Sequence, residues 1–347
     1  MNYSDILKIQ NVLYCFDFIN TSCAKKTRSV VSLTTMYVFM FGSIILTVGG
    51  NMVVIISISH FKKLHSPTNL LIVSLAATDF LLGLVVMPFS MVRTIESCWY
   101  FGDLFCTIHT CCDIMLCTAS IFHLCFISID RYYAVCQPLH YMSKITPSVA
   151  EGFVFISWSI PGVFAFGLVL SEIHLDGIQD YVTSITCTGF CSLIFNQIWG
   201  VMCSLITFFI PGTVMVGIYV HIFTVANKQA KQIDTQKTMS MHESKGCNKV
   251  PQKKEHKAAQ TLSIVMGVFI LCWLPFFILT IADPFLGFST PEDLYNAALW
   301  LGYFNSTFNP IIYGLFYPWF RKAFINIITG KIFSKGSSSL NLFPSDI

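Results

Sequence analysis

Long apolar stretches separated by short polar or charged segments make up most of this chain. An α-helix needs about 20 apolar residues to span the hydrocarbon of a bilayer. Seven stretches reach that length: residues 33–59, 68–92, 104–136, 150–170, 195–224, 260–282 and 294–316. The pattern predicts an all-α membrane protein with a seven-helix transmembrane bundle over 33–316, preceded by a segment over 1–32 and followed by a tail over 317–347.

The composition agrees with a membrane environment. Hydrophobic residues make up 54% of the 347 residues and charged residues only 11%, whereas soluble domains carry about 25% charged residues. Residues 1–32 mix Asp5, Lys8 and Asp17 with short apolar pieces, unlike a cleaved signal peptide. We therefore expect the first apolar stretch to be an uncleaved insertion signal.

The distribution of lysine predicts the orientation, because loops rich in Lys and Arg remain cytoplasmic. Residues 225–259 carry eight lysines, while acidic residues dominate the segments on the opposite side. The N-terminus is expected to be extracellular and the C-terminus cytoplasmic, in a multi-pass protein of the plasma membrane. Two glycosylation sequons, at Asn2 and Asn20, fall on the outer side. Six cysteines on that side allow fifteen pairings: Cys15, Cys23, Cys98, Cys106, Cys187 and Cys191.

Ionisable residues inside the spans point to function, because a charge at the bilayer centre costs at least ~2.5 kcal/mol. Asp79 lies in the middle of the second span, and Asp130-Arg131-Tyr132 lies at the inner end of the third. The adjacent acid and base can partly neutralise each other, which leaves the arginine free to change partners. This tripeptide is therefore a candidate switch.

Asp113 lies seven residues after Cys106, about 10 Å below the outer surface at 1.5 Å per residue. No Lys or Arg occurs in the spans at that level, so a cationic ligand would supply the missing charge. The alternative is a structural aspartate whose partners are hydroxyl groups or water.

Aromatic residues recur on one face of the sixth span and again on the seventh. These positions are Phe269, Trp273, Phe276, Phe277 and Thr280, followed by Trp300, Tyr303 and Thr307. Such stripes also occur in ordinary cores, but two of them at the depth of a carboxylate favour a cavity for a small organic ammonium. Prolines within spans permit hinges, and Pro275 lies two residues after Trp273.

Several short motifs occur in order along the spans. They are Gly50-Asn51, Leu75-Ala76-Ala77-Thr78-Asp79, Asp130-Arg131-Tyr132, Trp158, Pro211 with Tyr219, Cys272-Trp273-Leu274-Pro275 and Asn309-Pro310-Ile311-Ile312-Tyr313. With them the chain resembles the rhodopsin-class G-protein-coupled receptors. Within that class it resembles the trace-amine-associated receptors through Ser97-Cys98-Trp99-Tyr100-Phe101-Gly102, Gly302 to Pro310 and Phe316 to Lys322.

The resemblance implies a ligand pocket in which Asp113 anchors an amine. The other implied contacts are Ile114, Cys117, Cys203, Ser204, Thr207, Trp273, Phe276, Phe277, Trp300 and Tyr303. Span five lacks the second carboxylate that diamine-binding members use, and it lacks the serine cluster of catecholamine receptors. We therefore expect a primary arylalkylamine such as phenylethylamine.

The resemblance also implies roles beneath the pocket and outside it. The expected activation and coupling residues are Trp273, Ile121, Pro211, Phe269, Asp130, Arg131, Tyr132, Tyr219, Glu255, Asn309, Pro310 and Tyr313. Asp79, Ser120, Ser306 and Asn309 match an allosteric sodium site, and no other cofactor is expected. Disulfides are implied between Cys106 and Cys191 and between Cys23 and Cys187, while Cys15 and Cys98 remain unassigned.

The implied partners are a stimulatory or olfactory heterotrimeric G protein, acting through cyclic AMP, and membrane lipid, with no nucleic acid. Residues 317–329 are expected to form an amphipathic helix on the membrane, with Phe320 and Phe324 inward and Arg321 and Lys322 toward lipid headgroups. Other classes are less well supported. A neurotransmitter-type amine receptor remains open, but an amine transporter would need inverted repeats, and His123 lacks the neighbours of an enzyme site.

Overall fold

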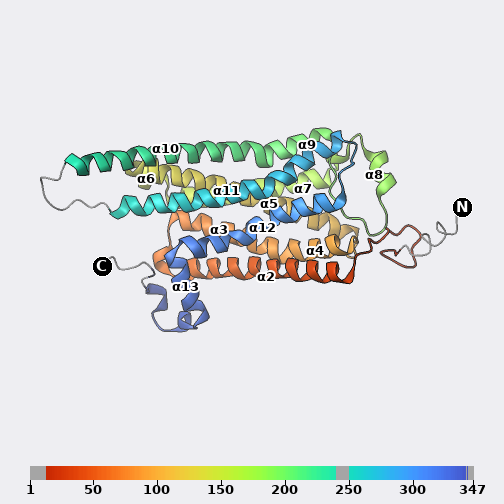
Figure 1. The fold of residues 1–347 in the computed structure, drawn as a ribbon, viewed down its shortest axis with the longest axis horizontal. Coiled ribbons are helices and arrows are strands. Elements are labelled where there is room, and N and C mark those ends of the chain that lie inside the picture. The colour runs from red at the N-terminus through yellow and green to blue at the C-terminus, as the bar shows by residue number, and fades with distance from the viewer. Residues whose placement is uncertain (1–12, 240–249, 341, 343–347) are drawn as a thin grey trace.

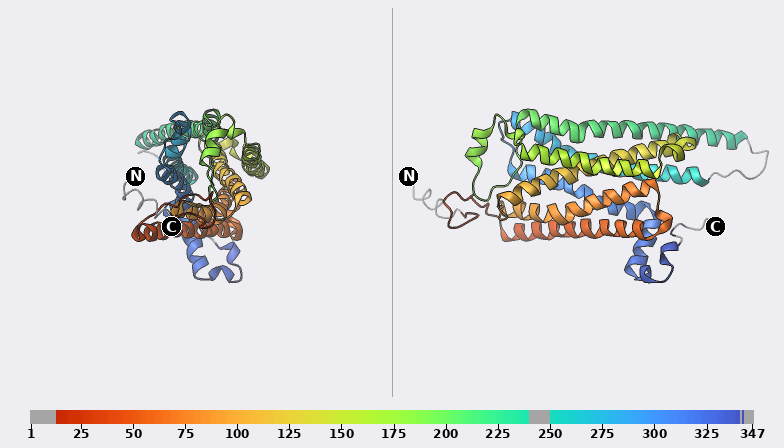
Figure 2. Two further views of the ribbon diagram at one scale, coloured as in Figure 1. Left: turned by 90° about the vertical axis from the view of Figure 1, so that its right-hand side faces the viewer. Right: turned by 180° about the vertical axis from the view of Figure 1, so that it is seen from behind.

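The computed structural model describes residues 13–239, 250–340 and 342, and these residues form long helices that run side by side (Figure 1). Figure 2 shows the bundle end-on at left and from the side at right, and the side view has the loop that carries α8 at one end and α13 near the other. The long helices are α2 (Val30–His60), α3 (Pro67–Leu81), α4 (Met87–Glu96), α5 (Asp103–Cys136), α7 (Pro147–Leu170), α9 (Gln197–Ser204), α10 (Ile210–Met239), α11 (Val250–Phe285) and α12 (Glu292–Phe316).

Seven rods result, because two π-helical turns join pairs of these helices. The turn η2 (Leu82–Val86) links α3 to α4, and η4 (Leu205–Phe209) links α9 to α10. Pro88 and Pro211 each follow one of these turns. A proline ring clashes with the carbonyl four residues before it, and a wider π turn at that place relieves the clash. Two of the expected proline hinges are therefore continuous helices with a local bulge.

Shorter elements connect the rods. The inner side carries η1 (Lys62–Leu64), α6 (Pro138–Lys144), α13 (Pro318–Ile328), η5 (Lys331–Phe333) and η6 (Ser337–Ser339). The outer side carries η3 (Ile173–Leu175) and α8 (Gln179–Ile185). The predicted all-α bundle is confirmed.

Six of the rods in the described part of the chain are long and apolar enough to cross a bilayer: Val30–His60, Pro67–Glu96, Asp103–Cys136, Pro147–Leu170, Gln197–Ala226 and Ser263–Phe285. The seventh rod, α12, has 25 residues but falls below that level of hydropathy. Its inner face carries the buried polar residues Asn305, Ser306, Thr307 and Asn309. These side chains face the bundle rather than lipid, so the helix keeps its place without uniform apolarity.

The observed boundaries differ most at the inner ends of two helices. Span five was expected to end at 224, but α10 continues to Met239, and span six was expected to begin at 260, but α11 begins at Val250. Lys, Gln and Ala favour helix in water, so the helix continues past the apolar stretch. On α13, Phe320 is buried as expected, but Phe324 is 42% exposed and does not point inward.

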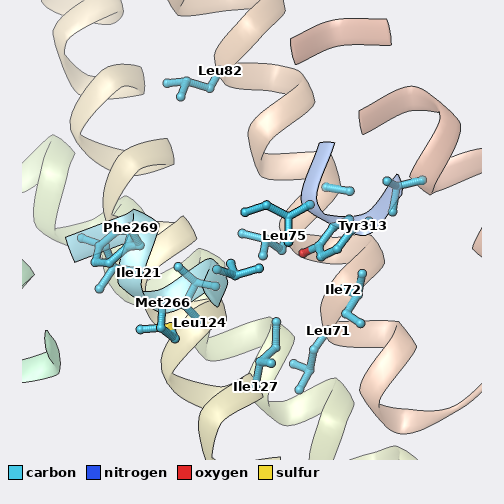
Figure 3. Packing of buried hydrophobic residues seen from close by; sticks show 14 of the residues in the cluster. Leu71, Ile72, Leu75, Leu82, Ile121, Leu124, Ile127, Met266, Phe269 and Tyr313 are labelled. Atoms are coloured by element: carbon cyan, nitrogen blue, oxygen red, sulfur yellow. The ribbon is translucent and has the colours of Figure 1, made fainter. Parts of the chain in front are cut away.

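The core between the helices is a continuous apolar cluster that includes Leu71, Leu75, Ile121, Leu124 and Phe269 (Figure 3). Polar side chains within it are matched to one another, as buried polar groups must be. His123, for which the sequence indicated no enzyme site, is fully buried and hydrogen-bonded at both ring nitrogens. Its Nε2 lies 2.7 Å from Ser74 Oγ, which also accepts a hydrogen bond from Trp158 Nε1 at 2.9 Å. This network joins three helices.

Candidate functional site

The Asp113 carboxylate lies half-buried on α5 and lines a cavity within the bundle. The Tyr303 hydroxyl on α12 donates a hydrogen bond to Asp113 Oδ2 at 2.6 Å. The Cys117 thiol donates a weaker one to Oδ1 at 3.4 Å. No salt bridge to Asp113 occurs among the described residues. The carboxylate is thus positioned by neutral donors and keeps its charge available for a ligand.

The cavity beside Asp113 has a volume of about 80 Å³, small compared with the roughly 300–1,000 Å³ of sites for drug-sized ligands. Nine of the eleven residues implied by the resemblance line it: Asp113, Ile114, Cys117, Cys203, Ser204, Thr207, Trp273, Phe276 and Phe277. Trp300 and Tyr303 do not line it. Tyr303 is fully buried behind the carboxylate, and Trp300 donates from Nε1 to Thr94 Oγ1 at 3.0 Å.

Aromatic rings form the wall of this cavity on α11. The ring centroid of Trp273 lies 5.8 Å from that of Phe276 and 5.9 Å from that of Phe277. Phe277 stacks on Phe208 of η4 with centroids 4.6 Å apart. These rings support one another in edge-to-face and stacked arrangements, so the wall is rigid and apolar.

The hydroxyl groups of the cavity wall on α9 and η4 already donate their protons within the protein. Ser204 Oγ donates to the Gly200 carbonyl at 2.7 Å, and Thr207 Oγ1 donates to the Cys203 carbonyl at 2.7 Å. Each hydroxyl therefore offers only lone pairs to a ligand. An aromatic ring without polar substituents can therefore pack against this wall without leaving a hydroxyl proton unpaired.

Some lining residues were not expected from the sequence. They are Thr118, Phe164, Leu168, Leu193, Phe195 and Leu299. Thr280 also lines the cavity and belongs to the face of span six that the sequence indicated. Leu193 and Phe195 come from the second outer loop, which has no helical periodicity to reveal their direction. The disulfide from Cys191 to α5 draws this loop over the cavity and was the available signal.

Three disulfides fasten the outer end. Cys106 is joined to Cys191 and Cys23 to Cys187, which are the two pairs that the resemblance implies. The third joins Cys15 to Cys98 and assigns the two cysteines that the sequence left open. The segment before α2 is therefore bound to both the first and the second outer loops, and it covers the mouth of the bundle.

Ion pairs reinforce this outer segment. Lys25 pairs with Glu96 at the end of α4, and Lys26 pairs with Asp293 at the start of α12. Arg28 Nη2 lies 2.8 Å from Asp293 Oδ1. The hydrogen bond with Glu96 raises the pKa of Lys25 above its ordinary value. Because the charged groups are partly exposed, each pair contributes little on its own, and the disulfides carry the attachment.

A second buried carboxylate, Asp79 on α3, lies deeper in the bundle. Its Oδ1 accepts from Ser306 Oγ at 2.7 Å and from Ser120 Oγ at 3.2 Å, and its Oδ2 accepts from Asn309 Nδ2 at 2.7 Å. The Oδ1 atoms of Asn51 and Asn309 are buried without a hydrogen-bond partner in the described structure. A carboxylate, two hydroxyls and spare amide oxygens are donors that suit a hard monovalent cation such as sodium.

The Asp130-Arg131 pair is closed at the inner end. Arg131 Nε donates to Asp130 Oδ2 at 2.8 Å, and Thr68 Oγ1 donates to the same oxygen at 2.8 Å. Tyr141 on α6, which the sequence did not single out, donates to Asp130 Oδ1 at 2.9 Å. Burial raises the pKa of Tyr141 to about 12, so this phenol remains a donor at neutral pH.

Three of the expected activation residues, Ile121, Pro211 and Phe269, come from the stretch of the bundle between the amine cavity and the Asp130-Arg131 pair. Ile121 and Phe269 are fully buried in the cluster of Figure 3, and the Pro211 carbonyl accepts from Cys125 Sγ at 3.9 Å. The hydroxyls of Tyr219 and Tyr313 are buried and lack a partner in the described structure. Tyr132 stays half-buried beside His221, and Pro310 packs within α12.

Three further residues that the sequence singled out lie away from the cavity or outside the described residues. Asn20 is exposed on the outer segment. Asn2 and the side chain of Glu255 lie outside the part of the chain that the structure describes.

Comparison with known proteins defines the class. A family model described as 7 transmembrane receptor (rhodopsin family) matches residues 50–313. The chain therefore belongs to the rhodopsin family of multi-pass membrane receptors, and it is a receptor rather than an enzyme.

Individual relatives place it more narrowly. The chain is 63% identical to trace amine-associated receptor 4 of Mus musculus over 99% of both chains. It is 52% identical to trace amine-associated receptor 13c of Danio rerio, over 95% of this chain and 96% of that one. It is 51% identical to trace amine-associated receptor 1 of Homo sapiens, over 95% of this chain and 98% of the relative. The chain belongs to the trace-amine-associated receptors, which confirms the resemblance in its motifs.

Proposed function

We propose that this receptor binds a small primary arylalkylamine of the phenylethylamine kind. The observation that carries the proposal is the Asp113 carboxylate, which lies without a salt-bridge partner in the described structure beside a small aromatic cavity. A primary ammonium has three N–H groups and can bond the oxygens that Tyr303 and Cys117 leave available. The family's printed name, trace amine, agrees with this chemistry.

The shape and polarity of the cavity support one amine rather than two. Cys203, Ser204 and Thr207 line the wall on α9 and η4, and no carboxylate joins them. A second ammonium would be desolvated there without a partner, at a cost of several kcal/mol. The apolar ring of the ligand would instead contact Trp273, Phe276 and Phe277, where aromatic–aromatic contact adds about 0.5–1.5 kcal/mol beyond the burial of apolar area.

Signal transfer starts at Trp273, which both lines the cavity and packs above the buried core. Pro275 interrupts the hydrogen bonds of α11 next to it, so pressure on the indole can tilt the inner half of that helix. The hydrogen-bonded Asp130-Arg131 pair corresponds to the resting state of the receptor. Its opening would let Arg131 reach other groups, and the unpaired hydroxyls of Tyr219 and Tyr313 would gain partners.

A stimulatory or olfactory G protein is the proposed partner at the inner end. Leu139 and Met142 on α6 are 93% and 81% exposed, although both are apolar. Exposed apolar residues beside a charged helix end are typical of a docking surface. Tyr141 on the same helix bonds Asp130, so docking on α6 and opening of the Arg131 pair are mechanically linked.

We propose that Asp79, Ser120, Ser306 and Asn309 hold a sodium ion. The orphaned Oδ1 atom of Asn309 and the uncompensated carboxylate support it. A bound cation would supply positive charge that steadies this arrangement. The chain's own residues provide the oxygens and keep them in place by packing between α3, α5 and α12.

The proposed location is the plasma membrane, with the N-terminus outside. The three disulfides lie at one end of the bundle, where an oxidising compartment is required. The exposed Asn20 sequon lies at the same end, whereas the lysine-rich residues 225–259 include the last turns of α10 and the first turns of α11, at the other end. Residues of α13 such as Ile325 and Ile328 are exposed and apolar, which suits contact with lipid.

A response panel tests the proposed ligand. Cells expressing the receptor are exposed to phenylethylamine, tyramine, dopamine and the diamine cadaverine, and cyclic AMP and amine uptake are both measured. We expect phenylethylamine to raise cyclic AMP at the lowest concentration, with no receptor-dependent uptake. A receptor that responds best to the diamine, or that accumulates amine without cyclic AMP, would contradict the proposal.

A further inference from the structure

Two cavities lie one above the other at the outer end of the bundle. The inner one, beside Asp113, measures about 80 Å³, and the outer one, beneath the N-terminal segment, measures about 630 Å³. Leu193, Phe195 and Thr280 line both. The two spaces are therefore separated by a partition only one side chain thick.

A hydrogen bond closes this partition between two helices. Thr280 on α11 donates from Oγ1 to the Phe276 carbonyl at 2.9 Å, so its proton is already used. Its Oγ1 also lies 3.2 Å from the Tyr295 hydroxyl of α12. Tyr295 must therefore be the donor and Thr280 the acceptor. This hydrogen bond joins α12 to α11 above the amine pocket.

Packing holds the Tyr295 ring in that position. Its centroid lies 5.3 Å from that of Phe276 in an edge-to-face arrangement. Phe276 in turn contacts Trp273 with centroids 5.8 Å apart. Tyr295 also lines the outer cavity but not the inner one, so its ring lies on the outer face of the partition.

We propose that the Tyr295–Thr280 bridge is the roof of the amine pocket and sets the maximum length of amine that the receptor accepts. The inference rests on the proposed function, since it assumes an ammonium on Asp113. With that end fixed, Trp273 and Phe277 close the pocket below and at the side, and Phe208 stacks on Phe277. A longer chain can then extend only upward into the larger cavity, and the bridge blocks that route.

The test compares amines that differ only in chain length: 2-phenylethylamine, 3-phenylpropylamine and 4-phenylbutylamine. Tyr295→Phe removes the donor, Thr280→Val removes the acceptor, and Tyr295→Ala removes the ring. The first two should improve the potency of the longest amine relative to the shortest by about 3- to 10-fold, the range that a single neutral hydrogen bond allows. Tyr295→Ala should shift the ratio further.

Two control variants separate the roof from general damage. Thr280→Ser keeps the acceptor and should keep the wild-type ratio. Asn296→Ala changes the neighbour of Tyr295 that also lines the outer cavity, and it should leave the ratio unchanged. Surface expression is measured for every variant, and the potency ratio within one variant cancels differences in receptor number.

The outcomes are distinct. If the wild-type receptor responds to 2-phenylethylamine and Tyr295→Ala, Tyr295→Phe and Thr280→Val all keep its length preference, the roof is overturned while the proposed function stands. If the wild-type receptor responds to none of the three amines, the proposed function fails and the roof falls with it. An equal shift in Asn296→Ala would also overturn the roof, because the effect would not be specific to the bridge.

Discussion

Gly302 on α12 lies directly against the indole ring of Trp273 on α11. A Cβ atom added at residue 302 would lie 2.6 Å from the ring carbons Cε3 and Cζ3, closer than real Cβ contacts allow. Glycine is therefore required here for a packing reason rather than for its backbone freedom. The position of the indole, which forms the floor of the amine cavity, depends on the missing side chain.

Gly302→Ala should therefore displace Trp273 and lower both stability and phenylethylamine potency. Overpacking a core costs about 1–3 kcal/mol, which corresponds to a melting temperature lower by a few degrees in a chain of this size. Thermal unfolding of the detergent-purified receptor measures it. Gly314→Ala is the control, because its added Cβ would meet Phe320 at an ordinary 3.6 Å. Equal stability of the two variants would refute the close contact.

Tyr303→Phe tests the positioning of the anchor. The hydroxyl donates to Asp113 Oδ2 at 2.6 Å, and hydrogen bonds to charged groups contribute about 1.5–3 kcal/mol. We expect about a 10- to 100-fold loss of phenylethylamine potency with normal surface expression. Tyr100→Phe in the outer loop should have no such effect. Unchanged potency in Tyr303→Phe would show that this hydrogen bond does not prepare the carboxylate for the amine.

Sodium should stabilise the receptor through Asp79. We expect a higher melting temperature in sodium chloride than in N-methylglucamine chloride of the same ionic strength. Asp79→Asn removes the charge while it keeps the size of the side chain, and it should abolish the difference between the two salts. A sodium effect that survives in Asp79→Asn would place the ion elsewhere.

The three-helix network of His123, Ser74 and Trp158 should contribute to stability but not to ligand recognition. His123→Ala leaves buried polar groups without partners, which costs about 1–3 kcal/mol, and it opens a cavity as well. The melting temperature should fall by several degrees, whereas His65→Ala, at an exposed position, should leave it unchanged. A large change in amine selectivity among correctly folded His123→Ala receptors would contradict a purely structural role.

The sequence predicted the bundle well, because bilayer thickness imposes a length on each apolar stretch. The sequence did not predict the helix boundaries beyond the bilayer, where membrane thickness no longer limits helix length. Nothing in hydropathy shows that α10 continues to Met239, because those residues are polar and helical at once. Conversely, α12 was predicted from the apolar stretch 294–316 although its hydropathy is low, and the motif that contains Asn309 and Pro310 supported that prediction.

The pocket was predictable where residues lie on regular helices. Asp113 and Trp273 follow from helical spacing and from the resemblance, and both line the cavity. Leu193 and Phe195 could not be predicted, because an irregular loop has no period that reveals the direction of its side chains. The Tyr295–Thr280 bond depends on how two helices are rotated against each other, and a single sequence does not carry that information.

The Cys15–Cys98 disulfide illustrates a different limit. Six cysteines allow fifteen pairings, and only the folded chain brings the right sulfur atoms together. The hydrogen bond from Tyr141 to Asp130 was likewise not predictable, because it joins residues on two separate helices, α6 and α5.

The most direct test of the account compares phenylethylamine binding to the wild-type receptor, Asp113→Asn and Asp103→Asn. Asp103 is an exposed carboxylate at the start of the same helix and serves as the matched control. Loss of the partner of a desolvated ammonium costs about 3–5 kcal/mol. We predict at least a ~100-fold loss of phenylethylamine affinity in Asp113→Asn and wild-type affinity in Asp103→Asn. Wild-type affinity in Asp113→Asn would contradict the assignment of this carboxylate as the amine anchor.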